Sequence, residues 1–241
     1  MGTVSELWRY PVVGLQGESL KMATILQTGI SGDRAYQLRD QSGKILGPVP
    51  QSSSPKERSI LGFGASIEET KGGVLKVTLG DEVTSIDKPD FSRRLDRAVG
   101  VPVRLEESTT LARRVKRGRA IHLISNSSIR ALKRSYPTGD FDIRRFRPNF
   151  VVQLGRGAQD FAEEAWVGRS LKVGNVVLKV ESPNERCTVT TLPQGSLPAD
   201  KRILETIIEA NDRSLGVMCS VETSGAVAVG DSVSLREDTP T

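Results

Sequence analysis

Apolar and polar residues alternate in short runs along most of this chain, and turn residues separate the runs. Pairs of runs flank residues 40–43, 80–81 and 174–175, which is the pattern of β-hairpins. At least two more runs lie between residues 214 and 235. The first run ends at Pro11, which has no backbone N–H to donate inside a sheet. This spacing predicts a mainly β protein with sheets closed into barrels or sandwiches.

A few segments show helical signals instead of alternation. One begins with Asp90 as an expected N-cap and stops at Gly100, an expected C′ glycine. A second begins at Ser125 or Asn126, and a third, residues 199–212, carries an apolar face. The predicted fold class is therefore mainly β with a few helices (α+β).

Two domains are expected in this length of chain. Residues 51–58 are polar and are expected to form a loop, whereas residues 106–120 are polar and then strongly basic, so we place the boundary there. Residues 1–105 and residues 106–241 are therefore predicted to form two separate domains. In this division, the first strands of the chain can still pair with strands of residues 106–241.

Composition narrows the class of protein. The chain has 241 residues with a net charge of +5, which permits a phosphate-bearing partner without requiring one. Two cysteines exclude a disulfide-rich secreted scaffold and suit a reducing compartment. No apolar run approaches the roughly 20 residues of a membrane span, and no signal-peptide pattern opens the chain. We expect a cytoplasmic protein without a membrane partner.

Cys187 is the first residue with candidate chemistry. It follows a predicted strand, with Arg186 beside it and the hydroxyls of Thr188, Thr190 and Thr191 after it. Neighbouring positive charge stabilises a thiolate, which is a nucleophile and a ligand for soft or high-valent metals. The alternative is a small buried apolar residue. Cys219 lies in an apolar run and is expected to belong to the core.

Arginines near residue 145 form the second feature. Arg144, Arg145 and Arg147 precede an apolar run, and in a strand Arg145, Arg147 and Asn149 would share one face. Two guanidinium groups on one face suit a phosphate. The alternative is a strand edge whose charges pair with the acidic residues of the preceding "DFDI".

Other polar residues allow more than one interpretation. His122 is the only histidine, and with two cysteines it cannot complete a four-ligand zinc site. It is a general acid, a hydrogen-bond donor at a helix start, or a satisfied structural histidine. In "SGDRAY", Gly32 permits a tight turn that either presents Asp33 and Arg34 to a ligand or simply leads into a strand.

The densest basic run, "RRVKRGR" at residues 113–119, has no interleaved aromatic residue and no nearby DNA-binding motif. It predicts a solvated, mobile loop rather than a nucleic-acid site. No Walker A, Rossmann or H-E-x-x-H pattern is present.

Taken in order, "YPVVGLQGESL", "GISGDRAYQLRD", "IHLISNSSI", "RRFRPNFVV", "ERCTVTTLPQG" and "GVMCSVETSGAVAVGDSV" resemble the MOSC family, the domains named for the C-terminus of molybdenum cofactor sulfurase. The opening part resembles the β-barrel that precedes this domain in the amidoxime reducing component and its bacterial relatives. The resemblance therefore implies an N-terminal β-barrel-like domain over residues 1–105 and a MOSC β-barrel over residues 106–241. The most specific segments are "RRFRPNFVV" and "ERCTVTT".

The resemblance implies a molybdenum–pyranopterin cofactor (molybdopterin), with Cys187 as the metal ligand and catalytic residue. It also implies a set of cofactor-binding residues, which are Arg34, His122, Ser125, Arg145, Arg147, Asn149, Arg186 and Thr188. The implied reaction is the reduction of N-hydroxylated small molecules with electrons from a separate protein. The alternative is a non-catalytic carrier of the cofactor, or of sulfur as a persulfide on Cys187.

Two departures from the family pattern concern the site. Val13 and Gly14 stand where reductases of the family usually carry Lys-Ser, and Leu-Pro stands in place of Asp-Pro after "TT". Neither pyridoxal phosphate nor an iron–sulfur cluster is expected, because a pyridoxal domain needs more chain and two cysteines cannot hold such a cluster.

Overall fold

Strands from both ends of the chain build one barrel. The computed structural model describes residues 1–47, 60–69 and 72–236, so the loop predicted at 51–58 lies outside the described residues. In the described part of the chain, seven strands pair in the order β12-β11-β15-β14-β13-β17-β1, and β1 pairs with β12 to close the ring. The strands are β1 Gly2–Arg9, β11 Ile121–Ser125, β12 Phe150–Leu154, β13 Ser170–Val173, β14 Val176–Glu185, β15 Ser214–Thr223 and β17 Ser232–Leu235, with β2 Glu18–Leu20 beside β1.

Alternation in the strands explains the barrel core. In β14, Val176, Leu178 and Val180 are fully buried, whereas Lys179 between them is partly exposed. Cys219 on β15 belongs to the same core, and burial raises the pKa of its thiol. Both cysteines are free. The core assignment of Cys219 and the mainly β fold class are thus confirmed.

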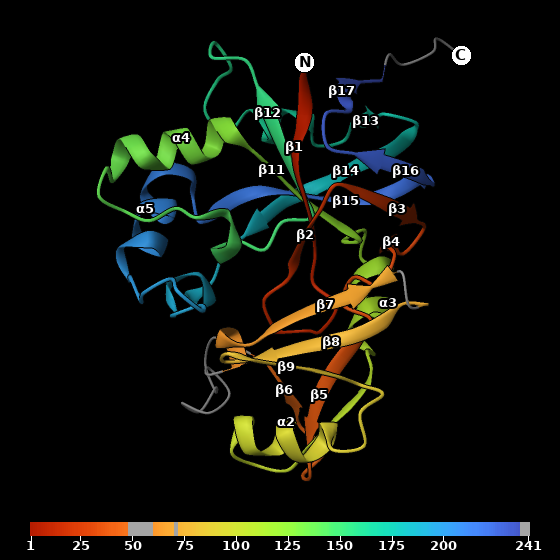
Figure 1. The fold of residues 1–241 in the computed structure, drawn as a ribbon. Helices are drawn as coiled ribbons and strands as arrows, with labels where there is room; N and C mark the ends of the chain where they lie inside the picture. The colour runs from red at the N-terminus through yellow and green to blue at the C-terminus, as the bar shows by residue number, and fades with distance from the viewer. Residues whose placement is uncertain (48–59, 70–71, 237–241) are drawn as a thin grey trace.

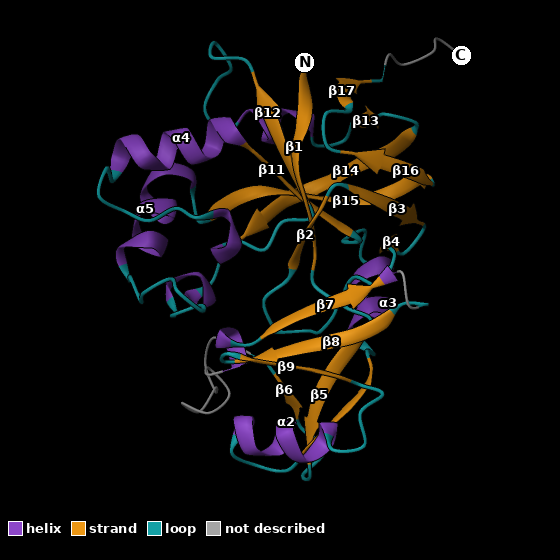
Figure 2. Cartoon of the chain, in the orientation of Figure 1, coloured by secondary structure: helices purple, strands orange, loops and turns teal. Residues whose placement is uncertain are grey.

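Helices cover one side of the barrel (Figure 2). α4 Asn126–Ser135 begins as expected at Ser125, whose side chain accepts from the backbone of Ser128. α5 Arg202–Asn211 packs against α4 and buries Ile203 and Ile207.

A smaller lobe lies beside the barrel, below it in Figure 1. Its strands are β5 Tyr36–Asp40, β6 Ile45–Leu46, β7 Gly64–Glu68, β8 Val74–Leu79, β9 Glu82–Ser85 and β10 Val103–Glu107. The hairpins predicted around 40–43 and 80–81 are confirmed, and so is the hairpin around 174–175 in the barrel. β3 Met22–Leu26 pairs with β4 Gly29–Ile30 and with β16 Gly225–Ala228, near the C-terminus.

α2 Phe91–Val99 completes the smaller lobe, after the short helix η1 Ile60–Gly62. Gly100 ends α2 in the left-handed conformation, as expected. Asp90 stands at the N-cap position but does not cap with its side chain, which pairs instead with Arg94.

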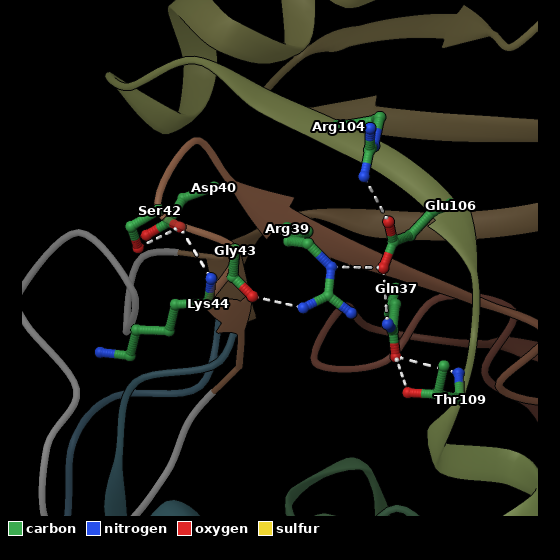
Figure 3. Close-up of polar contacts among 9 residues, drawn as sticks. All are labelled: Gln37, Arg39, Asp40, Ser42, Gly43, Lys44, Arg104, Glu106 and Thr109. Atoms are coloured by element: carbon green, nitrogen blue, oxygen red, sulfur yellow. Dashed lines mark hydrogen bonds and ion pairs between the residues drawn. The ribbon is translucent and has the colours of Figure 1, made fainter.

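The basic run begins in a helix, so the prediction of a solvated loop was wrong for residues 113–116. The rest of the run is a turn and irregular chain, and Arg113, Lys116, Arg117 and Arg119 are exposed. α3 spans Thr110–Lys116. Its start is fixed from β5, because the side-chain oxygen of Gln37 accepts from the backbone N–H of Thr109 at 3.2 Å (Figure 3). Gln37 in turn donates to Glu106 on β10. Hydrogen bonds from Gln37 and Arg39 lower the pKa of Glu106 to about 2, so this carboxylate stays charged and keeps the network together.

α3 is also fixed at its other end. Val115 packs against the barrel core. The carbonyl of Arg114 accepts from the backbone N–H groups of Arg117 and Arg119, and Gly118 turns there with φ of 66°. A Cβ on Gly118 would meet the side chain of Glu181 on β14 at 2.8 Å, so the chain approaches the barrel closely at this point. The basic helix is thus held between the smaller lobe and the barrel.

Candidate functional site

A cavity of about 570 Å³ opens where the barrel, the smaller lobe and α3 meet. The barrel side contributes residues from β11 and from the segments that flank β12 and β14, among them His122, Arg147 and Cys187. The smaller lobe contributes Ile45, and the segment between β4 and β5 contributes Arg34. Segments far apart in the sequence therefore form one wall, and most of the predicted site residues meet here.

Cys187 lies on this wall with partial exposure. It follows β14, as predicted, and precedes the short helix η5 Thr188–Thr191. Its carbonyl accepts from both the backbone N–H and the hydroxyl of Thr190, at 3.1 and 2.9 Å. These bonds fix the backbone of Cys187 and leave its thiol at the cavity.

Tyr10 supports two of the arginines. The guanidinium carbons of Arg34 and Arg147 lie 5.1 and 4.4 Å from the centre of its ring, within the range of cation–π attraction. Both arginines have positive φ, 53° and 54°, which L-residues rarely adopt. Burial raises the pKa of Tyr10, so its hydroxyl stays protonated and can donate.

Arg186 lies beside Cys187 and is held from two sides. Its backbone N–H donates to the carbonyl of Arg213, and its Nη2 donates to the carbonyl of Phe146 at 2.9 Å. Burial lowers the pKa of Arg186 to about 10, and the neighbouring Cys187 opposes this shift. The guanidinium is still charged at neutral pH.

The cavity concentrates positive charge. Its lining contains one acidic residue, Glu185, and the arginines at positions 34, 113, 114, 117, 119, 145, 147 and 186. Within the described residues, the buried side-chain N and O atoms without a hydrogen-bond partner are the Tyr10 hydroxyl, Nε and Nη2 of Arg114, and Nε of Arg186. All belong to this cavity or to the ring beneath its arginines. Buried donors are normally satisfied, so the arrangement is suited to an anion that accepts from them.

Three of the predicted cofactor-binding residues do not line the cavity. Ser125 caps α4 and donates to the buried Glu163. Asn149 accepts from the backbone N–H of His122 and donates to the carbonyl of Trp8, which ties β11 to β1. Thr188 lies in η5 with its carbonyl bound by Thr191. Their contacts stabilise the elements behind the site.

Arg145 lines the cavity but has no exposed surface. Its guanidinium donates to the carbonyls of Asp140 and Pro198, both at 2.8 Å, and to that of Leu192 at 3.5 Å. These bonds join the segment before β12 to the loop after η5.

The arginine segment is not a strand, so the expectation that Arg145, Arg147 and Asn149 share a strand face was wrong. Ile143–Arg145 forms a 3-10 turn, η3, which the side chain of Asp142 caps. Asp142 also pairs with the guanidinium of Arg144, as the alternative interpretation had it. The positive φ of Arg147 then turns its side chain toward the cavity and Tyr10.

His122 is buried on β11, and burial lowers its pKa well below the usual value, with Arg186 adding to the shift. The ring is therefore neutral at neutral pH. Asn184 Nδ2 lies 3.0 Å from Nε2, and the Arg147 carbonyl lies 3.4 Å from Nδ1. Nε2 also lies 3.3 Å from the Leu215 carbonyl. A proton on Nδ1 satisfies the contacts with Asn184 and Arg147, whereas a proton on Nε2 would satisfy the contact with Leu215. These contacts favour a structural role, in which His122 positions the backbone of Arg147.

Sequence reasoning missed Tyr10 and the arginines of α3. The signal for α3 was present in "RRVKRGR", but nothing local shows that this run folds against a cavity. Val13 and Gly14, the positions of the first departure, do line the cavity and bring no charge to it.

A bare metal ion has no ready site here. No group of three or more His, Cys, Asp or Glu side chains suited to a metal occurs in the described parts of the chain. A metal bound by Cys187 would need its other ligands from an organic group.

None of the helices in residues 1–47, 60–69 and 72–236 is long and apolar enough to cross a membrane.

Two family models together match most of this chain. The family model of the MOSC domain matches residues 103–234, and that of the MOSC N-terminal beta barrel domain matches residues 1–89. The mitochondrial amidoxime reducing component 2 of Bos taurus is 24% identical over 97% of this chain and 83% of its own length. The human protein of that name is 22% identical over the same shares. The crystal structure of the YUAD protein from Bacillus subtilis has a TM-score of 0.53 at 13% identity, covering 96% of this chain and 93% of that one, and it supports the fold alone.

Proposed function

This chain belongs to the MOSC family, and from that premise we propose that it binds a molybdenum–pyranopterin cofactor and reduces N-hydroxylated small molecules. One observation carries the proposal: the Cys187 thiol lies on the wall of an arginine-lined cavity that contains buried, unpartnered donors. The amidoxime reducing components among its relatives point to the same substrate class.

The guanidinium donors and the thiol on the cavity wall fit such a cofactor. A phosphate-bearing group would satisfy guanidinium edges that have no partner in the protein. A single thiolate suits a metal whose remaining ligands come from the pterin, and the cavity has room for a group of that kind. When bound, the cofactor would supply two-electron oxygen-atom transfer.

The protein's own residues would then bind the cofactor and orient it. Cys187 would hold the metal, with its backbone fixed by Thr190. Arg34, Arg147 and Arg186 would contact the anionic parts, the first two placed by the Tyr10 ring. His122 would keep the backbone of Arg147 in position, whereas Ser125, Asn149 and Thr188 would act from behind the cavity wall. Arg145 would fix the neighbouring loop.

The reaction breaks an N–O bond, consumes two electrons and two protons, and releases water. We propose that a separate protein supplies the electrons. The chain has only two cysteines, of which Cys219 is buried in the core, and these cannot hold an iron–sulfur cluster of its own. We propose a cytoplasmic location, and the boundary between the two domains within residues 106–120.

A carrier is the second candidate, and the uncharged Val13 and Gly14 on the cavity wall favour it. In that role the protein would hold the cofactor, or a persulfide sulfur on Cys187, for transfer to another enzyme.

The test is molybdenum content, measured by elemental mass spectrometry on protein from cells that make the cofactor. Wild-type protein is expected to hold near-stoichiometric molybdenum and to reduce an amidoxime with a chemically reduced dye. Cys187→Ala is expected to lose both, and Cys219→Ala, which removes the other thiol, is expected to retain both. Full molybdenum and full activity in Cys187→Ala would overturn the proposal. Molybdenum without reductase activity, or a persulfide mass shift on Cys187 without molybdenum, would favour the carrier.

A further inference from the structure

We propose that Arg114 of α3 is a phosphate-binding residue, so that the basic helix supplies one wall of an anion site whose other wall is the barrel. The inference rests on the proposed function in that the phosphate is taken to belong to the cofactor. None of the residues predicted from the sequence to bind the cofactor lies on α3.

Part of the Arg114 guanidinium is buried without a hydrogen-bond partner. The residue as a whole is half-buried, but its Nε and Nη2 are buried and have no hydrogen-bond partner. These two nitrogens form one edge of the guanidinium fork, which matches two oxygens of a phosphate or carboxylate. Arg145 shows the contrast, because that buried arginine donates to three backbone carbonyls. Arg114 therefore lacks the contacts that identify a structural arginine.

Other arginines repel the charge of Arg114. Burial lowers the pKa of Arg114 to about 9, and repulsion from Arg34 and Arg147 adds to the shift while Asp33 opposes it. Arg114 remains a cation at neutral pH within reach of two other cations. A doubly charged phosphate between the three guanidinium groups would attract each of them and offset their mutual repulsion. A buried guanidinium charge is costly without such a counter-charge.

Contacts at both ends hold α3 in place. Gln37 fixes its first turn, Val115 packs on the barrel core, and the carbonyl of Arg114 itself ends the helix. An exposed arginine on a mobile loop would bind an anion weakly because its side chain must be ordered first. The backbone of Arg114 is already fixed, and the residue lines the same cavity as Arg34 and Arg147. The uncharged Val13 and Gly14 also lie on this lining, so α3 brings charge to a cavity where they bring none.

The test uses full-length protein purified without cofactor and inorganic phosphate as the probe, titrated by calorimetry at constant ionic strength. Wild-type protein is expected to bind phosphate, and Arg114→Gln to weaken the dissociation constant by about tenfold or more. Arg114→Lys, which keeps the charge but loses the two-point edge, is expected to fall between them. Lys116→Gln is the matched control, because Lys116 is exposed on the same helix, does not line the cavity, and loses the same charge. Its affinity should stay within about twofold of wild type.

A stability measurement separates binding from a structural role. Without phosphate, Arg114→Gln is expected to melt at the same temperature as wild type or higher, because it removes a buried, unpaired cation. A lower melting temperature would mean that Arg114 holds the fold and would overturn the inference. Absence of phosphate binding in the wild type, or equal losses in Arg114→Gln and Lys116→Gln, would overturn it as well.

Molybdenum content distinguishes this inference from the proposed function. Phosphate binding that depends on Arg114 in a protein that never holds molybdenum would leave the inference standing and remove the proposed function. If wild type and Arg114→Gln both hold near-stoichiometric molybdenum, the inference is overturned and the proposed function is left intact.

Discussion

The guanidinium carbon of Arg147 lies 4.4 Å from the centre of the Tyr10 ring. Tyr10 follows β1, and its backbone N–H donates to Asp33 at 2.8 Å. Asp33 in turn pairs with Arg34, the second cation over the ring. One aromatic side chain thus places two site arginines from different parts of the chain, and its own hydroxyl is buried without a partner.

Two substitutions at Tyr10 should have opposite effects on the cofactor-free protein. Tyr10→Phe removes only the unpartnered hydroxyl, so the free energy of unfolding should stay the same or rise by up to about 1 kcal/mol. Tyr10→Leu removes the ring under both arginines and should lower it by about 2 kcal/mol or more. Urea unfolding measures both. A loss in Tyr10→Phe as large as that in Tyr10→Leu would show that the hydroxyl has a partner in the protein.

The backbone at Arg147 gives a second prediction. Arg147→Ala and Arg147→Gly remove the same guanidinium, but only glycine adopts a φ of 54° without strain. The glycine variant should therefore be more stable to urea by about 1 kcal/mol, while both variants lose molybdenum to the same extent. Equal stability of the two would mean that residue 147 is not left-handed in solution.

Local signals in the sequence predicted much of the fold. Turn residues marked the hairpins at 40–43, 80–81 and 174–175, and Ser125 and Gly100 marked helix ends, because each of these features depends on a few neighbouring residues. The position of Cys187 directly after a strand was readable for the same reason.

What the sequence left open depends on distant contacts. α3 begins where Gln37, 72 positions earlier, accepts from Thr109, so its basic residues looked like a loop when considered alone. The left-handed backbone of Arg147 is stabilised by contact with Tyr10 and has no signature in "RRFRPNF". The missing partners of Arg114 and Tyr10 appear only when the whole cavity is assembled.

Glu163 gives a pH prediction. Burial raises its pKa, although Ser125 and Ser128 donate to the carboxylate and oppose the shift. An unfolded glutamate titrates near about pH 4.3, so between that pH and the higher folded pKa the native state binds more protons. Stability from this group is therefore full below about pH 4.3 and declines as the pH rises through the folded pKa.

Glu163→Gln should remove that decline. The difference in unfolding free energy between Glu163→Gln and wild type should move in favour of the variant as the pH rises from about 4 to 8. Glu209→Gln, on the exposed face of α5, is the control for the loss of one negative charge. A difference that is flat across this range would show that the carboxylate of Glu163 is not destabilised by burial.

For Arg145, the role implied by the sequence differs from the contacts that the structure shows. The resemblance assigns it to the cofactor, whereas its guanidinium donates to the carbonyls of Asp140, Leu192 and Pro198. An ammonium group cannot reach three carbonyls in this fork geometry, and carbonyls left without a donor in a buried site are costly. Arg145→Lys should therefore lower the unfolding free energy of the cofactor-free protein by about 2–4 kcal/mol. Arg144→Lys is the neighbouring control, because that residue makes a partly exposed pair with Asp142 worth less than about 1 kcal/mol. If Arg145→Lys instead keeps its stability and loses only molybdenum, Arg145 contacts the cofactor directly and the three carbonyl bonds are secondary.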